Sequence, residues 1–131
     1  MESLEEIRAF FVNDRFATEA AGAVVDEAAD GRATCSLRIT PVHRNAAGAV
    51  MGGAIFALAD FAFAVATNRP GSLTVTVSST IEFVGQAKGE RLIARAEPVK
   101  AGKSLCFYST SVTDELGNLV AVVSTTGKRL S

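Results

Sequence analysis

The stretch AAGAVMGGAIFALADFAFAVA, residues 46–66, decides how this chain is expected to fold. It is apolar almost throughout, and Asp60 is its only ionisable side chain. We predict a helix over 53–67 that is apolar around most of its circumference and therefore buried on most sides. A charge in such a helix costs free energy unless it is paired or used. We favour a functional acid over a carboxylate that is paired with an arginine or bonded to a serine or threonine.

The same stretch is about as long as a membrane span. Its glycines and Asp60 disfavour one, because an aspartate near the centre of a span costs about 2.5–3.5 kcal/mol. Strand-like segments follow it, as they do in soluble proteins. We therefore expect no membrane association.

The flanking segments predict the elements around the helix. Ser3 and Glu6 fit a capping box at the start of a short amphipathic helix over 3–12. Residues 29–32 carry a hairpin signal, and 41–53 is expected to be a long irregular loop. The expected strands are 22–29, 32–39, 73–84, 91–100, 105–113 and 119–129.

Two strands carry further detail. The alternation in 73–84 places Val75, Val77, Ile81 and Phe83 on one face, and Pro98 indicates a bulge or a sheet edge. The order of elements predicts an α+β hot-dog fold, in which a curled antiparallel sheet of about six strands wraps one long helix. We expect a single domain, 1–131.

Composition narrows the function classes. The net charge is −1 and the basic residues are scattered, so no nucleic-acid surface is expected. The acidic N-terminus lacks the features of a signal peptide. Cys35 and Cys106 are isolated, which indicates buried thiols, a reduced cytoplasmic setting and no metal site.

Gly52 and Gly53 stand where the helix begins and leave backbone N–H groups bare for a ligand, although close helix packing would also explain them. Eight residues of helix from Gly52 to Asp60 rise about 12 Å. An attacking carboxylate must come within about 3–3.5 Å of a carbonyl carbon, and an oxyanion donor within about 2.7–3.1 Å of its oxygen. If both groups act, Asp60 of one subunit faces the Gly52 amide of another across a dimer interface.

Residues 45–64 resemble the signature N-x-x-G-x-x-H-G-G-x-x-F-x-L-A-D-x-A-F-A of PaaI-like thioesterases, which are hot-dog enzymes. Residues 13–17, residues 79–83 and the pair Gly102-Lys103 extend the resemblance over essentially the whole chain. It implies hydrolysis of an aromatic or medium-chain acyl-CoA without a cofactor, in a homotetramer of two dimers. Asp60 would be the catalytic carboxylate, as nucleophile or general base, and Gly52 the oxyanion-hole amide.

The resemblance also implies a substrate-binding set of Asn45, Met51 and Gly53. Asn45 either orients substrate or water, or only makes backbone bonds within its own loop. Met51 departs from the family, which often has histidine there, because methionine donates no hydrogen bond. This departure supports the alternative of a non-catalytic module that binds acyl-CoA or another apolar ligand. A dehydratase ranks last, because the sole histidine, His43, lies in no suitable motif.

Other side chains remain candidates only. Phe56, Phe63 and Phe83 would line an acyl pocket or belong to the core. The basic residues Lys100, Lys103 and Arg69 would meet the CoA phosphates or be solvated. Gly85-Gln86 stands where the family often has Arg-Pro, which weakens any phosphate contact there.

Overall fold

The computed structural model describes residues 2–130, so Met1 and Ser131 of the expected domain lie outside the described residues. Helix α1 (Leu4–Phe11) precedes strands β1 (Val24–Ala29) and β2 (Arg32–Arg38), and helix α2 (Gly52–Thr67) follows them. The chain then forms four strands: β3 (Thr74–Phe83), β4 (Arg91–Ala101), β5 (Leu105–Asp114) and β6 (Leu119–Arg129). Two short helical turns that the sequence pattern did not predict are η1 (Phe16–Ala20) and η2 (Pro41–His43).

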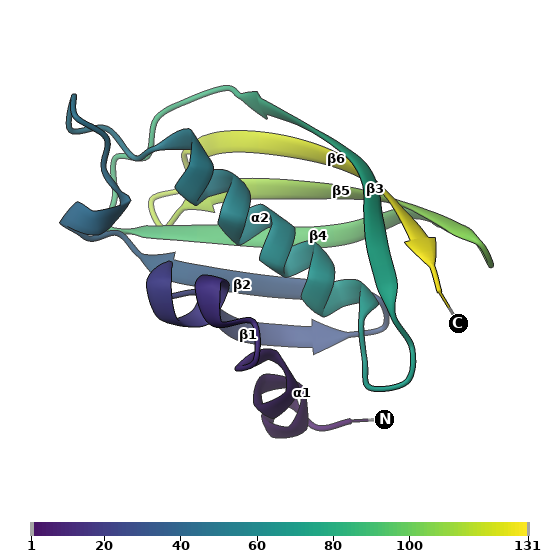
Figure 1. Cartoon of the computed structure of the whole chain (residues 1–131). Coiled ribbons are helices and arrows are strands. Elements are labelled where there is room, and N and C mark those ends of the chain that lie inside the picture. Colours follow the sequence, from purple (N-terminus) through teal and green to yellow (C-terminus); the bar gives the residue numbers. More distant parts are fainter. Residues whose placement is uncertain (1, 131) are drawn as a thin grey trace.

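The strands form one antiparallel sheet in the order β1-β2-β4-β5-β6-β3, and this sheet curls around α2 (Figure 1). The expected α+β hot-dog fold is therefore confirmed. The expected capping box is also present, because the Ser3 hydroxyl accepts the Glu6 N–H at 3.2 Å and the Glu6 carboxylate accepts the Ser3 N–H. Asp30 and Gly31 form the expected hairpin turn, with φ of 54° and 73°.

Helix α2 supplies the centre of the core. Nine of its 16 residues are buried, and Leu58, Ala62 and Val65 are fully so. One face, made by Gly53, Ala57, Asp60 and Ala64, is not covered by the sheet. This open face carries Asp60, so the acid is exposed rather than enclosed within the chain.

The expectation that Val75 and Val77 lie on the same face of β3 as Ile81 and Phe83 is wrong. A bulge between Thr76 and Ser78 shifts the register against β6, so Val75 and Val77 do not share the inner face with Ile81. Thr74 is buried instead, while Val75 and Val77 are 45% and 60% exposed. The bulge expected near Pro98 is confirmed between Pro98 and Lys100, in an interior strand.

Two carboxylates hold the segment between β3 and β4 in place. Asp114 accepts the backbone N–H groups of Lys88 (2.8 Å) and Gly89 (3.1 Å), and Glu115 accepts that of Glu90 (2.8 Å). Asp114 also accepts three hydrogen bonds within its own hairpin, from the backbone of Leu116 and from the backbone and side chain of Asn118. The segment after β3 is therefore fixed against the turn between β5 and β6.

The remaining expectations concern the thiols and the membrane. Cys35 and Cys106 are both free and buried, as predicted. Burial raises the pKa of the Cys35 thiol to about 12, which leaves it protonated at neutral pH. No helix within residues 2–130 is long and apolar enough to cross a membrane.

Candidate active site

The start of α2 presents bare amides. Met51 is its N-cap and makes no side-chain cap hydrogen bond. Ala54 and Ile55 donate to the Met51 carbonyl, whereas the N–H groups of Gly52 and Gly53 make no hydrogen bond within residues 2–130. Both are free to bind an oxygen with partial negative charge.

Close packing also explains one of the two glycines. A Cβ added at Gly52 would lie 3.0 Å from Cζ of Phe83, whereas one added at Gly53 would make only ordinary contacts with Met51. The Phe83 ring from β3 therefore packs directly against the first residue of α2. Gly52 combines both roles considered from the sequence, a bare amide and a close approach.

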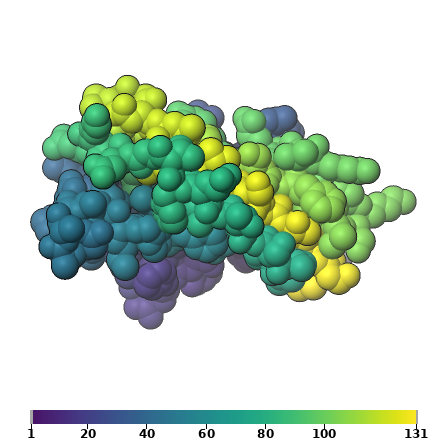
Figure 2. Space-filling model, turned by 90° about the horizontal axis from the view of Figure 1, so that it is seen from above, coloured from purple at the N-terminus to yellow at the C-terminus, as the bar shows by residue number. Residues whose placement is uncertain are grey.

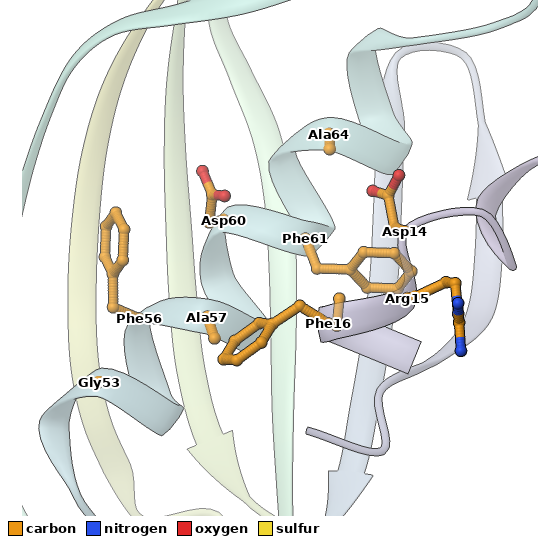
Figure 3. A pocket seen from close by; sticks show the side chains of 10 residues that line it. Asp14, Arg15, Phe16, Gly53, Phe56, Ala57, Asp60, Phe61 and Ala64 are labelled. Carbon is orange, nitrogen blue, oxygen red and sulfur yellow. The ribbon is translucent and has the colours of Figure 1, made fainter. Parts of the chain in front are cut away.

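Asp60 stands two turns further along the open face of α2. It lines a pocket of about 520 Å³, here called the Asp60 pocket, with Asp14, Phe16, Gly53 and Phe56 among its walls (Figure 3). The carboxylate makes no hydrogen bond or ion pair within the described part of the chain. The pocket walls shield the exposed carboxylate from part of the solvent, and this partial burial, followed by the negative charge of Asp14, raises the pKa of Asp60 above its ordinary value. Among residues 2–130, Asp60 is therefore not the paired or bonded acid that the sequence left open as an alternative.

Arg15, the one cation among the described residues that line the Asp60 pocket, already has a partner. Arg15 bonds to Glu19 through two nitrogens, at 2.6 and 2.9 Å. Arg15 is the residue before η1 and Glu19 lies within it, so the pair leaves the Asp60 carboxylate without a counter-ion among residues 2–130. An unpaired carboxylate of raised pKa is suited to proton transfer or nucleophilic attack.

Gly52 faces a different pocket of about 620 Å³, here called the Gly52 pocket, with Arg44, Phe83 and Gln86 on its walls. Gly53 is on the Asp60 pocket, but Gly52 is not. One chain therefore does not bring the Gly52 amide and the Asp60 carboxylate to one place.

The loop before α2 answers the question about Asn45. Its Oδ1 accepts the N–H groups of Ala47 (3.0 Å) and Ala49 (3.1 Å). These bonds match the loop role and leave less capacity to orient a substrate. His43 is likewise structural, since its Nδ1 accepts the Thr40 N–H at 3.0 Å and its Nε2 donates to the Ala21 carbonyl at 2.7 Å.

Met51 is 49% exposed and lines a third pocket of about 310 Å³, here called the Met51 pocket, with Phe16, Ala20, Val42, His43 and Gly53. The sequence pattern had not singled out Phe16, Val42 or Arg44 as pocket residues. They reach the start of α2 only because η1, η2 and the loop after η2 fold against it, and such short turns carry little periodic signal.

Of the candidate aromatic and basic residues, two line the Asp60 and Gly52 pockets, one belongs to the core and three lie elsewhere. Phe63 is core, packed edge-on against Tyr108 with ring centroids 5.2 Å apart. Phe56 lines the Asp60 pocket and Phe83 the Gly52 pocket. Lys100 lies near the end of β4 and Lys103 in the turn between β4 and β5. Arg69 follows the far end of α2, where its Nε is 3.9 Å from Glu2. No three His, Cys, Asp or Glu side chains within residues 2–130 are grouped to hold a metal ion.

Comparisons with known proteins agree with this fold and motif. The family model "Thioesterase superfamily" matches residues 47–121. Human "Acyl-coenzyme A thioesterase 13" is 33% identical over 98 residues, which cover 72% of this chain and 70% of the relative. The solved PaaI protein of Escherichia coli superposes with a TM-score of 0.84 at 25% identity, covering 98% of this chain and 97% of that one. The TT0310 protein of Thermus thermophilus gives a TM-score of 0.79 at 34% identity, over 86% of this chain and 96% of that one. The chain therefore belongs to the thioesterase superfamily, and its likeness to the PaaI-like enzymes is the one that the central motif predicted.

Proposed function

We propose that this protein hydrolyses the thioester of an aromatic or medium-chain acyl-CoA to a free acid and CoA. The observation that carries the proposal is the division of α2 between an unpaired carboxylate, Asp60, and a bare amide, Gly52, which face separate pockets. The family supplies the reaction class, and the names of the human and Escherichia coli relatives supply the acyl-CoA substrate.

The two groups have complementary tasks. The Gly52 N–H, at the positive end of α2, polarises the thioester carbonyl and stabilises the oxyanion that forms on its oxygen. Asp60 of the other subunit then acts in one of two ways. It attacks the carbonyl carbon and expels the CoA thiolate, after which water hydrolyses the acyl-aspartate; or it takes a proton from the water that attacks.

Both routes need Asp60 ionised. Since its pKa is raised, the acid limb of the pH profile is expected above the ordinary range of an aspartate, and activity rises with pH through that limb. The pH profile of kcat/KM measures this directly.

A homodimer is the minimal unit of the proposal, and a dimer of dimers its expected assembly in a cytoplasmic setting. Strand β3 ends the sheet and leaves one edge open within the described chain, and it lies at the surface seen from above (Figure 2). Val75 and Val77 are exposed on this strand, where a second copy would cover them. Sedimentation at micromolar concentration is expected to show a dimer or tetramer, and a monomer would contradict a two-chain site.

The activity test uses a panel of acyl-CoA thioesters and a thiol-detecting reagent. Wild-type protein is expected to release thiol, and the Asp60→Ala variant to release none above background. Release by neither protein, together with measurable CoA binding, would instead establish the non-catalytic binding module that Met51 suggests.

A mixing experiment tests the two-chain site itself. Asp60→Asn and Gly52→Pro are each expected to be inactive as pure proteins. In a mixed dimer one site carries both lesions and the other carries none, so random co-assembly restores about one quarter of the wild-type activity. No restoration, in mixed dimers verified by mass, would show that both groups act from one chain.

A further inference from the structure

The first turn of α2 separates an apolar pocket from one whose walls are both polar and apolar. The Met51 pocket lies between η1, η2 and α2, and Gly53 is on its wall. The Gly52 pocket lies between the loop after η2, the start of α2 and the segment after β3. Consecutive residues of one helix start, Met51 to Gly53, thus reach both pockets.

The Met51 pocket offers an apolar surface. Phe16 and Val42 are 73% and 79% exposed, and both line it beside Ala20 and Met51. Among the described residues on its wall, His43 has the only polar side chain, and both of its ring nitrogens are used within the chain, by Thr40 and Ala21. The histidine therefore presents no free donor or acceptor to a ligand.

The Gly52 pocket offers donors. The Arg44 guanidinium gives one N–H to the Gly48 carbonyl at 2.9 Å. It has no carboxylate partner within residues 2–130, so most of its five donors remain available. Gln86 and the bare Gly52 N–H add further polar groups.

An acyl-CoA has the same asymmetry about its carbonyl, with an apolar acyl group on one side and a polar, phosphate-bearing arm on the other. We propose that the substrate lies across the first turn of α2, with its acyl group in the Met51 pocket and its CoA arm in the Gly52 pocket against Arg44. This orientation rests on the proposed function and deepens it. A volume of about 310 Å³ lies at the small end of ligand sites, about 300–1,000 Å³, so the pocket fits a medium-chain or single-ring acyl group.

The orientation also gives Met51 a role. A methionine supplies a flexible, polarisable wall that a histidine would make polar. The departure from the family motif then favours an apolar acyl group next to the carbonyl, rather than marking a lost site.

The test compares acyl chain lengths in matched variants of the intact protein. Ala20→Leu fills the Met51 pocket, and Val42→Thr adds a hydroxyl to it without a change of shape. Ala101→Leu and Val99→Thr are the controls, since both positions are exposed and lie at the far end of β4. The measured quantity is the ratio of kcat/KM for octanoyl-CoA to that for propionyl-CoA.

We expect Ala20→Leu and Val42→Thr to lower this ratio and the controls to leave it at the wild-type value. Each methylene of the acyl chain that is excluded from the Met51 pocket is expected to lower kcat/KM about fourfold. Arg44→Gln is expected to raise KM for every chain length alike, to weaken inhibition by free CoA, and to leave the ratio unchanged.

Two results overturn the orientation. A ratio that changes with Arg44→Gln and not with Ala20→Leu means that the substrate lies the other way round. A ratio that neither variant moves means that the acyl group binds elsewhere. If wild-type protein hydrolyses none of the thioesters, the proposed function is wrong. The orientation is then tested in the same variants by the ratio of the dissociation constants of octanoyl-CoA and propionyl-CoA.

Discussion

Two aspartates, Asp114 and Asp60, are held in opposite ways. Asp114 is buried at the end of β5 and accepts five hydrogen bonds. The side-chain hydrogen bond from Asn118 has the largest effect on this carboxylate. Together with the backbone donors it holds the pKa of Asp114 well below its ordinary range. Asp60 is exposed on α2, accepts no hydrogen bond from the described chain, and has a raised pKa.

The difference separates a structural acid from an available one. The lone pairs of Asp114 are occupied by a hairpin and by the segment after β3, so this carboxylate fixes the wall of the Gly52 pocket. The carboxylate of Asp60 has no such occupation and opens onto a pocket. Removing each acid should therefore damage a different property of the protein.

Replacing Asp60 should produce the largest effect on activity. Asp60→Asn keeps the shape and removes the ionised carboxylate that both proposed routes need, so kcat is expected to fall by about 10²–10⁴-fold. The melting temperature should stay the same or rise slightly, because an acid of raised pKa destabilises the fold once pH exceeds that pKa. Steady-state kinetics and thermal melts at pH 7 test both halves; a large loss of stability would identify Asp60 as a second structural acid.

Gly52→Pro removes the proposed oxyanion donor and should lower kcat by about 10²–10³-fold. Proline is tolerated at the first residue of a helix, and Met51 already has the extended backbone, ψ 141°, that a following proline requires. Gly52→Ala is the control, since it brings the same Cβ against Phe83 and keeps the N–H. Equal losses in both variants would assign the effect to packing.

Replacing Asp114 should act on stability first. Asp114→Asn replaces the carboxylate that accepts the N–H groups of Lys88 and Gly89 by a neutral amide, which accepts hydrogen bonds through one oxygen only. The melting temperature of this variant is expected to be several degrees lower than that of the wild type at pH 7. Because its pKa is lower in the folded state, the ionised Asp114 stabilises the fold fully above the pKa of the unfolded state, near 3.8. This stabilisation is lost as the pH falls through the pKa of the folded state. The gap between wild type and variant should therefore narrow below about pH 4. A gap that stays constant with pH would contradict the assignment.

The smallest effect is expected at Thr110, whose polar side chain is shielded from solvent. Its hydroxyl is buried in β5 and makes no hydrogen bond within the described residues. Thr110→Val removes that unsatisfied group at nearly constant shape and should stabilise the fold by about 1 kcal/mol. Chemical denaturation measures the change, and a destabilised variant would show that the hydroxyl has a partner in the assembled protein.

Local patterns predicted most of the fold. The alternation and turn residues placed all six strands within about two residues of their observed ends, which is within the usual uncertainty of element boundaries. They did not reveal the bulge after Thr76, because a bulge breaks the period-two signal that defines a strand. They also missed η1, in which Ala21 donates to the Phe16 carbonyl at 2.9 Å and turns Phe16 toward the open face of α2.

Some features of the candidate site could likewise be predicted from the sequence, and others could not. The sequence by itself determined the helix, its bare glycines and the spacing of Gly52 from Asp60, because these depend on residues within one element. Only the tertiary structure decided that Phe83 covers Gly52, that Phe63 is core and that Arg44 and Met51 line separate pockets. Each of these depends on segments that meet through folding, and no local period or spacing records which segments those are.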